Sequence, residues 1–365
     1  MKQNYNKKKL IFLTLDITLI GGVERMLSTL IPYIKFKNDY DVEIISFFNS
    51  NNAFKFSFED ITLKYYSSSK FDISTKINSC LTYFRLLLSV LKLKKNKNTI
   101  YISTFPNISI FYLLFRGNKN LIITEHAQFD AHNDFVNKIR VLLYKKALCI
   151  TVLTYDQYLV FSNFCKASCI YIIPNPIEGS QFKATYSSQN IISVGRLVSE
   201  KGYDKFIKSL SILRKTNPHF KALIIGSGPE KGYLLNLIQT LQLNNNIQII
   251  ENETNVIKYL VNSKVFVVTS STESFGLAML ESLSVGVPIV SFDAGVGPKS
   301  LLINNYNGFL VSYGDVELLS EKIQAILNLN ESEWSNLSLN AKKSSENYNI
   351  NNIYPLWKTM LDQLA

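Results

Sequence analysis

Two glutamates in the second half of the chain have the type and spacing to do chemistry. Glu273 and Glu281 stand eight positions apart, just after an apolar run at 265–268 that is typical of a buried parallel strand. Glu273 falls in the loop at the carboxyl end of that strand, where open α/β sheets bind ligands. Glu281 falls inside the following helix, among apolar residues where a carboxylate is costly to bury alone. A ligand rich in hydroxyl donors is the simplest reason to place both acids there.

Two cations supply the opposite charge. Arg196 and Lys201 stand five positions apart in the run S-V-G-R-L-V-S-E-K-G (193–202), in which Gly195 ends a predicted strand and a helix follows. An arginine and a lysine at the carboxyl edge of a sheet, beside a helix N-terminus, suit a diphosphate: the arginine contacts it bidentately and the lysine adds a point charge. The alternative is a solvated pair without a ligand.

Glycine turns follow two other predicted strands. Gly21 and Gly22 come directly after the first strand and before a helix, which lets a backbone approach a ligand and leaves a helix N-terminus to meet negative charge. Gly226 opens a second turn, G-S-G-P-E (226–230), that could line a nucleotide. In both places the alternative is a tight turn and nothing more. Neither turn has the G-x-G-x-x-G spacing of a dinucleotide-binding fingerprint.

Histidine is scarce, and one of the three stands at a strand end. His126 follows the predicted strand 121–124 in the motif T-E-H, where it could contact a sugar hydroxyl or charge that develops in a transition state, or be structural. His132 and His219 are predicted in loops, so the histidines give no metal cluster. Asp39 and Asp41 spell D-x-D, but the motif precedes a strand and predicts a turn. We therefore expect no metal site and no cofactor.

The composition indicates a two-domain protein with an uneven charge. The chain has 365 residues, 47% of them hydrophobic, and its formal net charge of +11 lies almost wholly in residues 1–178, which carry +10. A basic half suits an anionic membrane surface, a phosphorylated lipid or nucleic acid; a codon bias toward Lys, Asn and Tyr is the alternative. The segments 81–97 and 135–146 are basic and amphipathic, so each predicts either a helix lying on an anionic bilayer or an ordinary sheet-packing helix. Nucleic acid is disfavoured because no aromatic-basic surface motif or helix-turn-helix pattern occurs.

The remaining bulk features favour a cytoplasmic protein. The four cysteines show no disulfide framework, which fits a reducing compartment. The apolar run 10–20 imitates a signal peptide, but Asp16 interrupts it and no cleavage site follows, so we predict a first strand. No uncharged apolar run of about 18 residues predicts a transmembrane helix.

Apolar runs alternate with helical periods along the whole chain, which predicts parallel sheets wound on both faces. The helical periods include 23–36, 203–214 and 316–328. The strands fall into two series, hence two domains, with a boundary at Pro174-Asn175-Pro176-Ile177. The first series is 10–16, 42–48, 61–65, 99–104, 121–124, 148–153 and 169–173; the second is 190–194, 221–225, 247–250, 265–268, 287–291 and 309–311. We expect domains at 1–176 and 177–348, with an amphipathic helix at 349–365 returning to the first.

Taken in order, these motifs resemble a known family. G-G-V-E-R (21–25), T-E-H (124–126), N-P-I (175–177), S-V-G-R-L-V-S-E-K-G (193–202), G-S-G-P-E (226–230) and E-S-F-G-L-A-M-L-E (273–281) look like retaining GT-B glycosyltransferases of family 4. G-G-V-E-R with the strand-end E-H further resembles bacterial members that extend lipid-linked glycans, capsules or lipopolysaccharide. The resemblance implies two Rossmann-like doubly wound domains facing across a cleft, the first on the acceptor side and the second binding the nucleotide sugar.

The resemblance also implies roles for particular residues. Arg196 and Lys201 would hold the diphosphate, Glu273 the donor sugar and Glu281 the ribose, and His126 would sit by the sugar. His126, Glu273, Arg196 and Lys201 would form the catalytic set. The donor-binding set would be Gly21, Gly22, Gly195, Arg196, Lys201, Gly226, Glu273, Ser274, Phe275, Gly276, Leu277 and Glu281. The loop 251–255, E-N-E-T-N, would hold the base of the nucleotide. It lacks the family's usual glycine and is acidic, but UDP remains the expected sugar carrier.

The leading hypothesis is transfer of a hexose or N-acetylhexosamine from a UDP-sugar to a lipid-linked glycan acceptor. The anomeric configuration would be kept by a same-face, ion-pair-like displacement. The enzyme would be peripheral on the inner face of the cytoplasmic membrane. The alternatives are a nucleotide-sugar epimerase or hydrolase, and a non-catalytic membrane-associated partner of another transferase.

Overall fold

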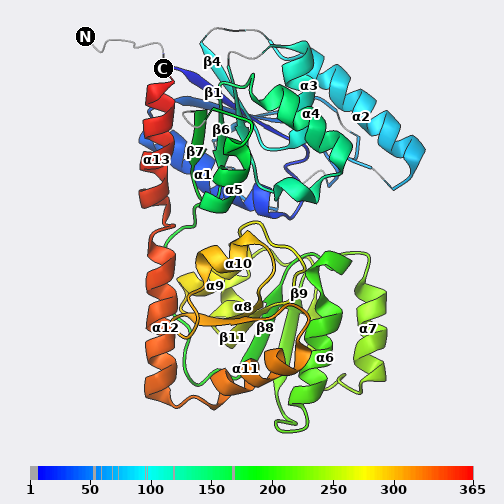
Figure 1. The fold of residues 1–365 in the computed structure, drawn as a ribbon, viewed down its shortest axis with the longest axis vertical. Helices are drawn as coiled ribbons and strands as arrows, with labels where there is room; N and C mark the ends of the chain where they lie inside the picture. The colour runs from blue at the N-terminus through cyan, green and yellow to red at the C-terminus, as the bar shows by residue number, and fades with distance from the viewer. Residues whose placement is uncertain are drawn as a thin grey trace. The chain divides into compact units, whose positions relative to one another are not determined.

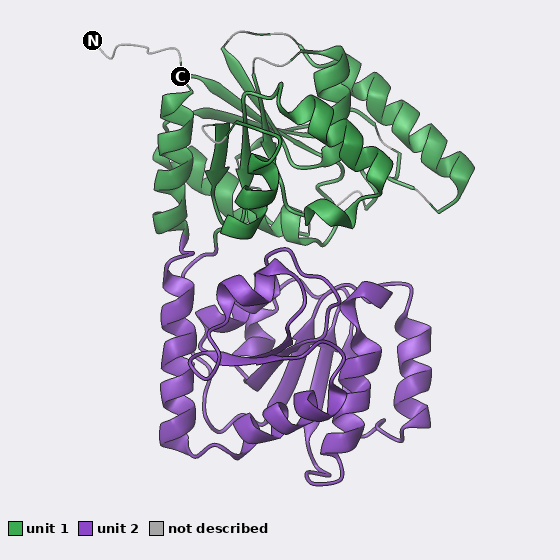
Figure 2. Ribbon diagram, in the orientation of Figure 1, with its two compact units in different colours: residues 1–176, 350–365 green, residues 177–349 purple. Residues whose placement is uncertain are grey.

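The computed structural model describes residues 7–51, 55–58, 60–67, 69–72, 74–94, 96, 98–117, 120–166 and 169–364. The chain separates into two compact units (Figure 2): unit 1 comprises residues 1–176 and 350–365, and unit 2 comprises residues 177–349. The division falls within the Pro174–Ile177 connector, where two prolines stiffen the backbone.

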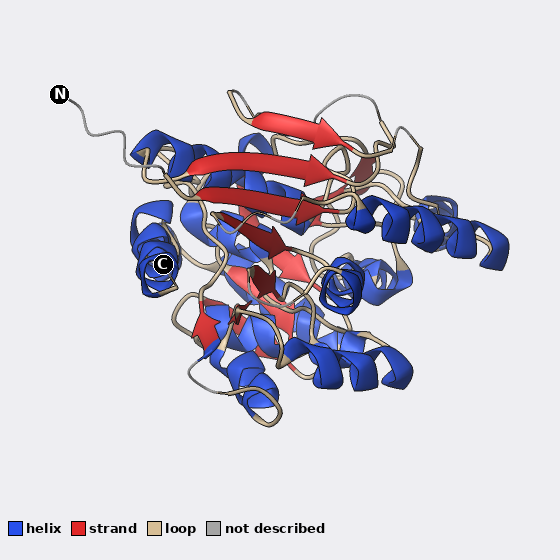
Figure 3. Cartoon of the chain, turned by 90° about the horizontal axis from the view of Figure 1, so that it is seen from above, coloured by secondary structure: helices blue, strands red, loops and turns tan. Residues whose placement is uncertain are grey.

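Unit 1 is built on a seven-stranded parallel sheet of order β3-β2-β1-β4-β5-β6-β7. The central strands are buried on both faces, which is why they read as continuous apolar runs. Figure 3 shows neighbouring strands (red) lying side by side and pointing the same way. The strands are β1 (Lys9–Thr14), β2 (Asp41–Ser46), β3 (Thr62–Tyr65), β4 (Thr99–Ser103), β5 (Leu121–Thr124), β6 (Cys149–Val152) and β7 (Ile170–Ile172).

Helices connect these strands, and capping side chains fix where several of them begin. Thr75, Asn133 and Thr154 each accept a hydrogen bond from the backbone N–H three residues on, which satisfies a donor that the first helical turn leaves free. The helices of unit 1 are α1 (Gly22–Lys37), α2 (Lys76–Leu91), α3 (Pro106–Phe115), α4 (Asp134–Tyr144), α5 (Tyr155–Ser162) and α13 (Ile350–Gln363) (Figure 1).

Unit 2 is built on a six-stranded parallel sheet of order β10-β9-β8-β11-β12-β13. Its strands are β8 (Asn190–Val194), β9 (Lys221–Ile225), β10 (Ile247–Ile250), β11 (Ser263–Val268), β12 (Ile289–Phe292) and β13 (Gly308–Val311). Its helices are α6 (Tyr203–Leu213), α7 (Lys231–Thr240), α8 (Ile257–Leu260), α9 (Leu277–Ser284), α10 (Val296–Leu301), α11 (Val316–Asn328) and α12 (Glu331–Glu346).

The structure confirms the predicted α/β class and every predicted strand. Both sheets are parallel, and helices separate most successive strands. The two doubly wound parallel sheets that the sequence predicts are therefore present. Differences are confined to strand ends, by one or two residues, such as β11, which starts at Ser263 instead of residue 265.

The C-terminal helix α13 is part of unit 1 and packs on α1. The Tyr40 hydroxyl donates to Asp362 at 2.8 Å, and the Tyr354 hydroxyl donates to Asp39. Lys358 pairs with Asp39 at 3.5 Å. Asp39 and Tyr40 thus form a turn that fastens the C-terminal helix, and Asp41, the second acid of the D-x-D motif, begins β2.

Candidate nucleotide-sugar site

The order of strands in unit 2 reverses between β8 and β11, which makes the loops that follow these strands the expected ligand site of an open α/β sheet. Direct bonds hold the two loops together. The Thr269 hydroxyl donates to the Lys201 carbonyl at 3.0 Å, and the Ser271 N–H donates to the Glu200 carbonyl at 2.8 Å. Gly202 has a φ of 63°, and a Cβ there would lie 2.3 Å from the Thr269 carbonyl oxygen, so this crossing requires glycine.

The two loops bring Lys201 and Glu273 together, although they are 72 residues apart in sequence. The Lys201 Nζ lies 2.6 Å from the Glu273 Oε2, and the Ser270 hydroxyl donates to the same oxygen at 3.3 Å. The two side chains are 21% and 19% exposed, so both are accessible to a ligand while partly shielded from water. A cation and a hydroxyl acceptor therefore share one edge of the sheet.

Arg196 lies differently from Lys201. Its side chain is 63% exposed, and its guanidinium pairs with Glu200, four residues on, at 2.7 Å. An exposed i,i+4 pair is weak and easily exchanged for another anion. Arg196 thus lies on the same loop as Lys201, but its guanidinium pairs with the exposed Glu200.

At Gly195 and Gly226, two backbone turns lie in direct contact. A Cβ on Gly226 would lie 1.8 Å from the Gly195 carbonyl oxygen, so the turn after β9 packs directly on the turn after β8. Tyr203, at the start of α6, is buried beneath Gly195 and hydrogen-bonds with Ser193; burial raises the pKa of its hydroxyl. The contact that the structure records for Gly226 is therefore with the neighbouring loop.

The residues from Ser274 to Leu277 form the turn into α9. Gly276 is the N-cap of this helix with a φ of 91°, and Ser274 and Leu277 on either side of it are half-buried. Phe275 is buried and stacks edge-on against Tyr348 at 5.5 Å between ring centroids.

Further contacts anchor this turn and the helix behind it. The Gly297 N–H donates to the Glu273 carbonyl at 2.8 Å, which fixes the loop against α10. Glu281 lies one turn into α9 and is 8% exposed, as the sequence predicted for this carboxylate.

The acidic loop after β10 carries its own counter-charges. Glu251 pairs with Lys231, and Glu253 pairs with Lys258 at 2.5 Å and accepts from the Tyr259 hydroxyl at 3.2 Å. The hydrogen bond from Lys258 lowers the pKa of Glu253. The acidity that sets this loop apart from the family pattern is thus offset locally.

In unit 1, Gly21 and Gly22 lie at the start of α1, after the strand β1 beside which the order of this sheet reverses. The Glu24 carboxylate folds back over Gly21, because a Cβ there would lie 2.4 Å from its Oε2. Asp16 is fully buried in the same loop and accepts from the Ser50 N–H at 2.8 Å. The loop after β1 is therefore held by two carboxylates.

His126 follows β5 of unit 1, as predicted. Its Nε2 lies 2.9 Å from the Thr124 hydroxyl oxygen, and Asn175 contacts the ring. Burial lowers the pKa of His126 to about 4, so the imidazole is neutral at physiological pH.

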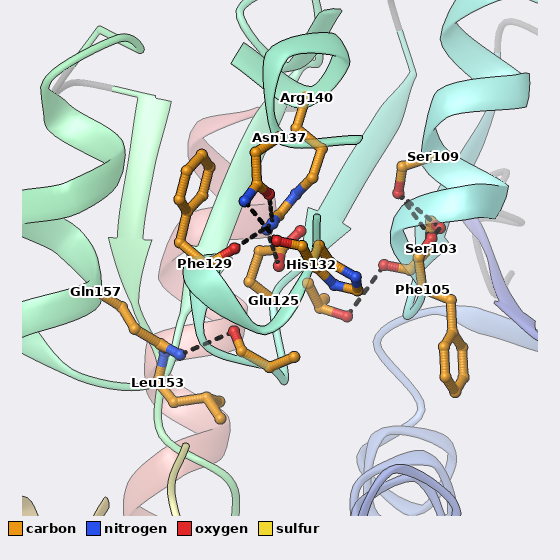
Figure 4. A network of polar contacts seen from close by, with 12 residues as sticks. Ser103, Phe105, Ser109, Glu125, Phe129, His132, Asn137, Arg140, Leu153 and Gln157 are labelled. Atoms are coloured by element: carbon orange, nitrogen blue, oxygen red, sulfur yellow. Dashed lines mark hydrogen bonds and ion pairs between the residues drawn. The ribbon is translucent and has the colours of Figure 1, made fainter. Parts of the chain in front are cut away.

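A buried ion pair supports the loop that carries His126 (Figure 4). Arg140 of α4 donates to Glu125 at 2.7 Å and to the Phe129 carbonyl at 3.1 Å, and both charged side chains are almost fully buried. Burial raises the pKa of Glu125, and Arg140 opposes that rise. Burial and the charge of Arg140 also lower the pKa of His132.

Sequence reasoning missed several residues of these sites. Glu200 was readable as a partner of Arg196 from the i,i+4 spacing. Thr269 and Tyr203 carry no such signal, because their partners, Lys201 and Ser193, lie on other segments. Ser270 lies three residues before its partner Glu273 in the same loop. Arg140 lies in the basic segment 135–146, for which the sequence left bilayer contact and sheet packing open; its guanidinium is buried. Among the described residues, no group of three or more His, Cys, Asp or Glu side chains is placed to hold a metal ion.

Solved structures share this fold over the whole chain. A mutant of Staphylococcus aureus TarM in complex with fondaparinux, alpha-GlcNAc-glycerol and UDP matches with a TM-score of 0.80 and 17% identity, covering 97% of this chain and 99% of that one. The pneumococcal O-GlcNAc transferase GtfA in complex with UDP and GlcNAc matches with a TM-score of 0.81 and 15% identity, covering 99% of both chains. The protein therefore has the GT-B fold of two parallel-sheet units.

The sequence comparisons match this chain to glycosyltransferases. Residues 181–344 match the family model described as "Glycosyl transferases group 1". An uncharacterized glycosyltransferase of Haemophilus influenzae is 28% identical over 365 residues, covering 97% of this chain and 100% of its own length. An amylovoran biosynthesis glycosyltransferase of Erwinia amylovora is 25% identical, covering 97% and 99%. The chain is a glycosyltransferase, and the part that matches the group 1 model, residues 181–344, spans nearly all of unit 2.

Proposed function

We propose that the protein is a retaining glycosyltransferase that moves a hexose or N-acetylhexosamine from a UDP-sugar to a glycan acceptor in bacterial surface polysaccharide or glycoconjugate biosynthesis. Unit 2 binds the donor and unit 1 the acceptor. The observation that carries the proposal is the contact between Lys201 and Glu273 at the switch point of the unit 2 sheet. It unites a diphosphate-binding cation with an acceptor for sugar hydroxyls.

The donor exchanges partners with this pair when it binds. The diphosphate takes the ammonium of Lys201 from Glu273, and a sugar hydroxyl then donates to the released carboxylate. Arg196 turns from Glu200 to the diphosphate, at little cost because its present pair is exposed. Glu281 holds the ribose, and the backbone from Phe275 to Leu277 contacts sugar and phosphate at the start of α9.

Transfer itself is a same-face displacement. The bond between the anomeric carbon and the β-phosphate oxygen breaks, and the acceptor oxygen forms a bond to the same face of that carbon. The proton of the acceptor hydroxyl moves to the departing phosphate oxygen. Lys201, Arg196 and the N–H groups of α9 stabilise the charge on the leaving diphosphate.

The names of relatives support retention and a lipid-linked acceptor. A Campylobacter jejuni relative, 25% identical over 94% of this chain, is named as an alpha-1,4-N-acetyl-D-galactosaminyltransferase acting on an undecaprenol-linked glycan. A Bacillus subtilis relative, 27% identical over 53% of this chain, is named as a poly(glycerol-phosphate) alpha-glucosyltransferase. Because the common UDP-hexoses are α-linked, an α product corresponds to retention.

A panel of UDP-sugars, each with and without polyprenol-linked glycans, tests the proposal by UDP release and by NMR of the product. We expect release that depends on the acceptor, an α linkage, and loss of turnover in Glu273→Ala with the fold intact. Conversion of a UDP-sugar without acceptor would favour an epimerase or hydrolase instead. A Glu273→Ala enzyme with undiminished turnover would refute the assigned site.

A further inference from the structure

Helix α2 of unit 1 has an apolar face that the described part of the molecule leaves uncovered. Figure 1 shows α2 (cyan) at the outer edge of unit 1, with α3, on which it packs, beside it. Five large apolar side chains of α2 are between 41% and 73% exposed: Ile77, Leu81, Phe84, Leu88 and Leu91. Their spacing of four, three, four and three residues places them in one stripe along the helix.

This stripe is a second apolar face on a helix that is already docked. The opposite side of α2 buries Leu86 and Val90 completely, and the Thr82 hydroxyl donates to the Asp72 carbonyl at 2.7 Å. The stripe is therefore not needed to hold α2 on unit 1. A contiguous exposed apolar face of this kind marks an interaction surface.

The charged residues of α2 itself are all cations, and the carboxylate next to the start of the helix, Asp72, hydrogen-bonds with the Asn78 side chain at 2.8 Å. Residues 73–124 contain no Asp or Glu and eight Lys or Arg. Four of these cations, Lys76, Arg85, Lys92 and Lys94, are exposed on α2 or directly after it; Lys95 and Lys97 lie outside the described residues. An apolar stripe flanked by cations complements a surface that is apolar inside and anionic outside, which describes a bilayer with anionic lipids.

The second basic segment, α4, lacks such a face. It buries Leu143 and Tyr144 in the core of unit 1, and Arg140 in the ion pair with Glu125. Its exposed large apolar side chains are Phe135 and Leu142, seven residues apart with no apolar residue of that exposure between them. Of the two segments that the sequence offered for membrane contact, the structure favours α2. Among the described residues no helix is long and apolar enough to cross a membrane.

We propose that α2 docks the protein on an anionic bilayer, lying in the plane of the headgroups. Its stripe (Ile77, Leu81, Phe84, Leu88 and Leu91) enters the boundary with the acyl chains. Its cations contact the anionic headgroups. The inference deepens the proposed function by naming the surface on which the enzyme meets a lipid-linked acceptor. The role in meeting the acceptor rests on the proposed function, whereas docking on the bilayer is argued from α2 alone.

Flotation of the full chain with vesicles tests the docking surface. We expect binding to phosphatidylcholine vesicles that contain phosphatidylglycerol, weakened by added salt, and little binding to phosphatidylcholine alone. The combined variant Leu81→Ser, Phe84→Ser and Leu88→Ser should bind at least tenfold more weakly. Because these side chains are exposed, its thermal midpoint and UDP affinity should match those of the wild type.

Two single variants serve as matched controls. Leu142→Ser on α4 and Leu235→Ser in unit 2 each replace a leucine of similar exposure, and both should bind vesicles as the wild type does. Unchanged vesicle binding by the α2 variant, or an equal loss in Leu142→Ser, would overturn the proposal. So would light scattering that shows a dimer dissociated by the α2 variant, because a second copy would then cover the stripe.

A probe on α2 reports insertion directly. Cys80 is exposed on α2, whereas Cys149 and Cys165 are buried, so an environment-sensitive fluorophore can be attached to Cys80 in a Cys169→Ser background. Anionic vesicles should shift its emission to the blue, and brominated lipids should quench it. Binding without either change would show that α2 is not in the interface and would contradict the proposal. UDP affinity, measured alongside, tests the donor site separately.

Discussion

Lys201→Met separates the role of this cation in donor binding from its role in the fold. The Lys201 ammonium and the Glu273 carboxylate are 2.6 Å apart and each about one-fifth exposed. The substitution keeps the length of the side chain and removes the charge. If Lys201 holds the diphosphate, the loss should fall on ligands that carry one.

The magnitudes follow from the partial exposure of the pair. A hydrogen bond to a charged group contributes about 1.5–3 kcal/mol, so the affinity for UDP should fall roughly 10- to 100-fold. The cost to stability should be only about 1 kcal/mol, because both side chains keep some contact with solvent and Ser270 also hydrogen-bonds with Glu273. That corresponds to a fall of roughly 2–4 °C in the thermal midpoint for a domain of this size.

Isothermal titration with UDP, UMP and uridine provides the assay. The effect of Lys201→Met should be large for UDP and absent for uridine, and Lys201→Arg should retain most of the affinity. Glu273→Gln should behave in the opposite sense: UDP binds as well or better because a competing carboxylate is gone, whereas turnover of the UDP-sugar falls. Equal losses for UDP and uridine, or unchanged UDP affinity in Lys201→Met, would refute the assignment of Lys201 to the diphosphate.

Two further predictions concern unit 1. Arg140→Met should cost about 3–5 kcal/mol of unfolding free energy, because it leaves the Glu125 carboxylate buried without its cation, and adding Glu125→Gln should restore most of that loss; denaturant titrations that show additive losses would contradict this. The pKa of His126 is about 4 in the folded protein, below its ordinary value of 6.5, so the unfolded chain binds the proton first as the pH falls. His126 should therefore lower the free energy of unfolding as the pH falls from about 6.5 to about 4. His126→Asn should therefore flatten the loss of stability in that window, and an unchanged pH dependence would show that His126 is not buried in neutral form.

The strands were predictable because both sheets are parallel and covered on both faces. The start of strand β11 was not predictable from apolar residues. The strand begins with Ser263 and Lys264, which are polar, so the apolar pattern indicated a start at residue 265. Lys264 is nevertheless buried, because its ammonium lies 4.1 Å from the centre of the Tyr186 ring and its stem fills the core. The pattern could not indicate that partner, which lies on another segment.

Strand β12 was predicted two residues too early for a similar reason. Pro288 has no N–H to give to a ladder, and the Val287 N–H is used in the turn after α9, where it donates to the Ser282 carbonyl at 3.0 Å. The strand therefore begins at Ile289. An apolar run marks burial, but where the ladder starts depends on which backbone donors are free.

The candidate site was predictable in its location and less so in its contacts. Parallel strands bring their carboxyl ends to one edge, so the loops of Lys201 and Glu273 had to lie close. That the two side chains pair with each other depends on loop conformations fixed by Gly202 and Thr269. The pairing of Arg196 with Glu200, by contrast, is local and could be predicted from their i,i+4 spacing.

The edge of the unit 2 sheet beside β8 and β11 is the proposed binding site of a nucleotide diphosphate sugar. A crystal structure of the protein soaked with UDP tests this most directly. We expect the diphosphate on Lys201 and the backbone at the start of α9, with Glu273 released from Lys201. A diphosphate bound elsewhere, with the Lys201–Glu273 pair intact, would contradict it.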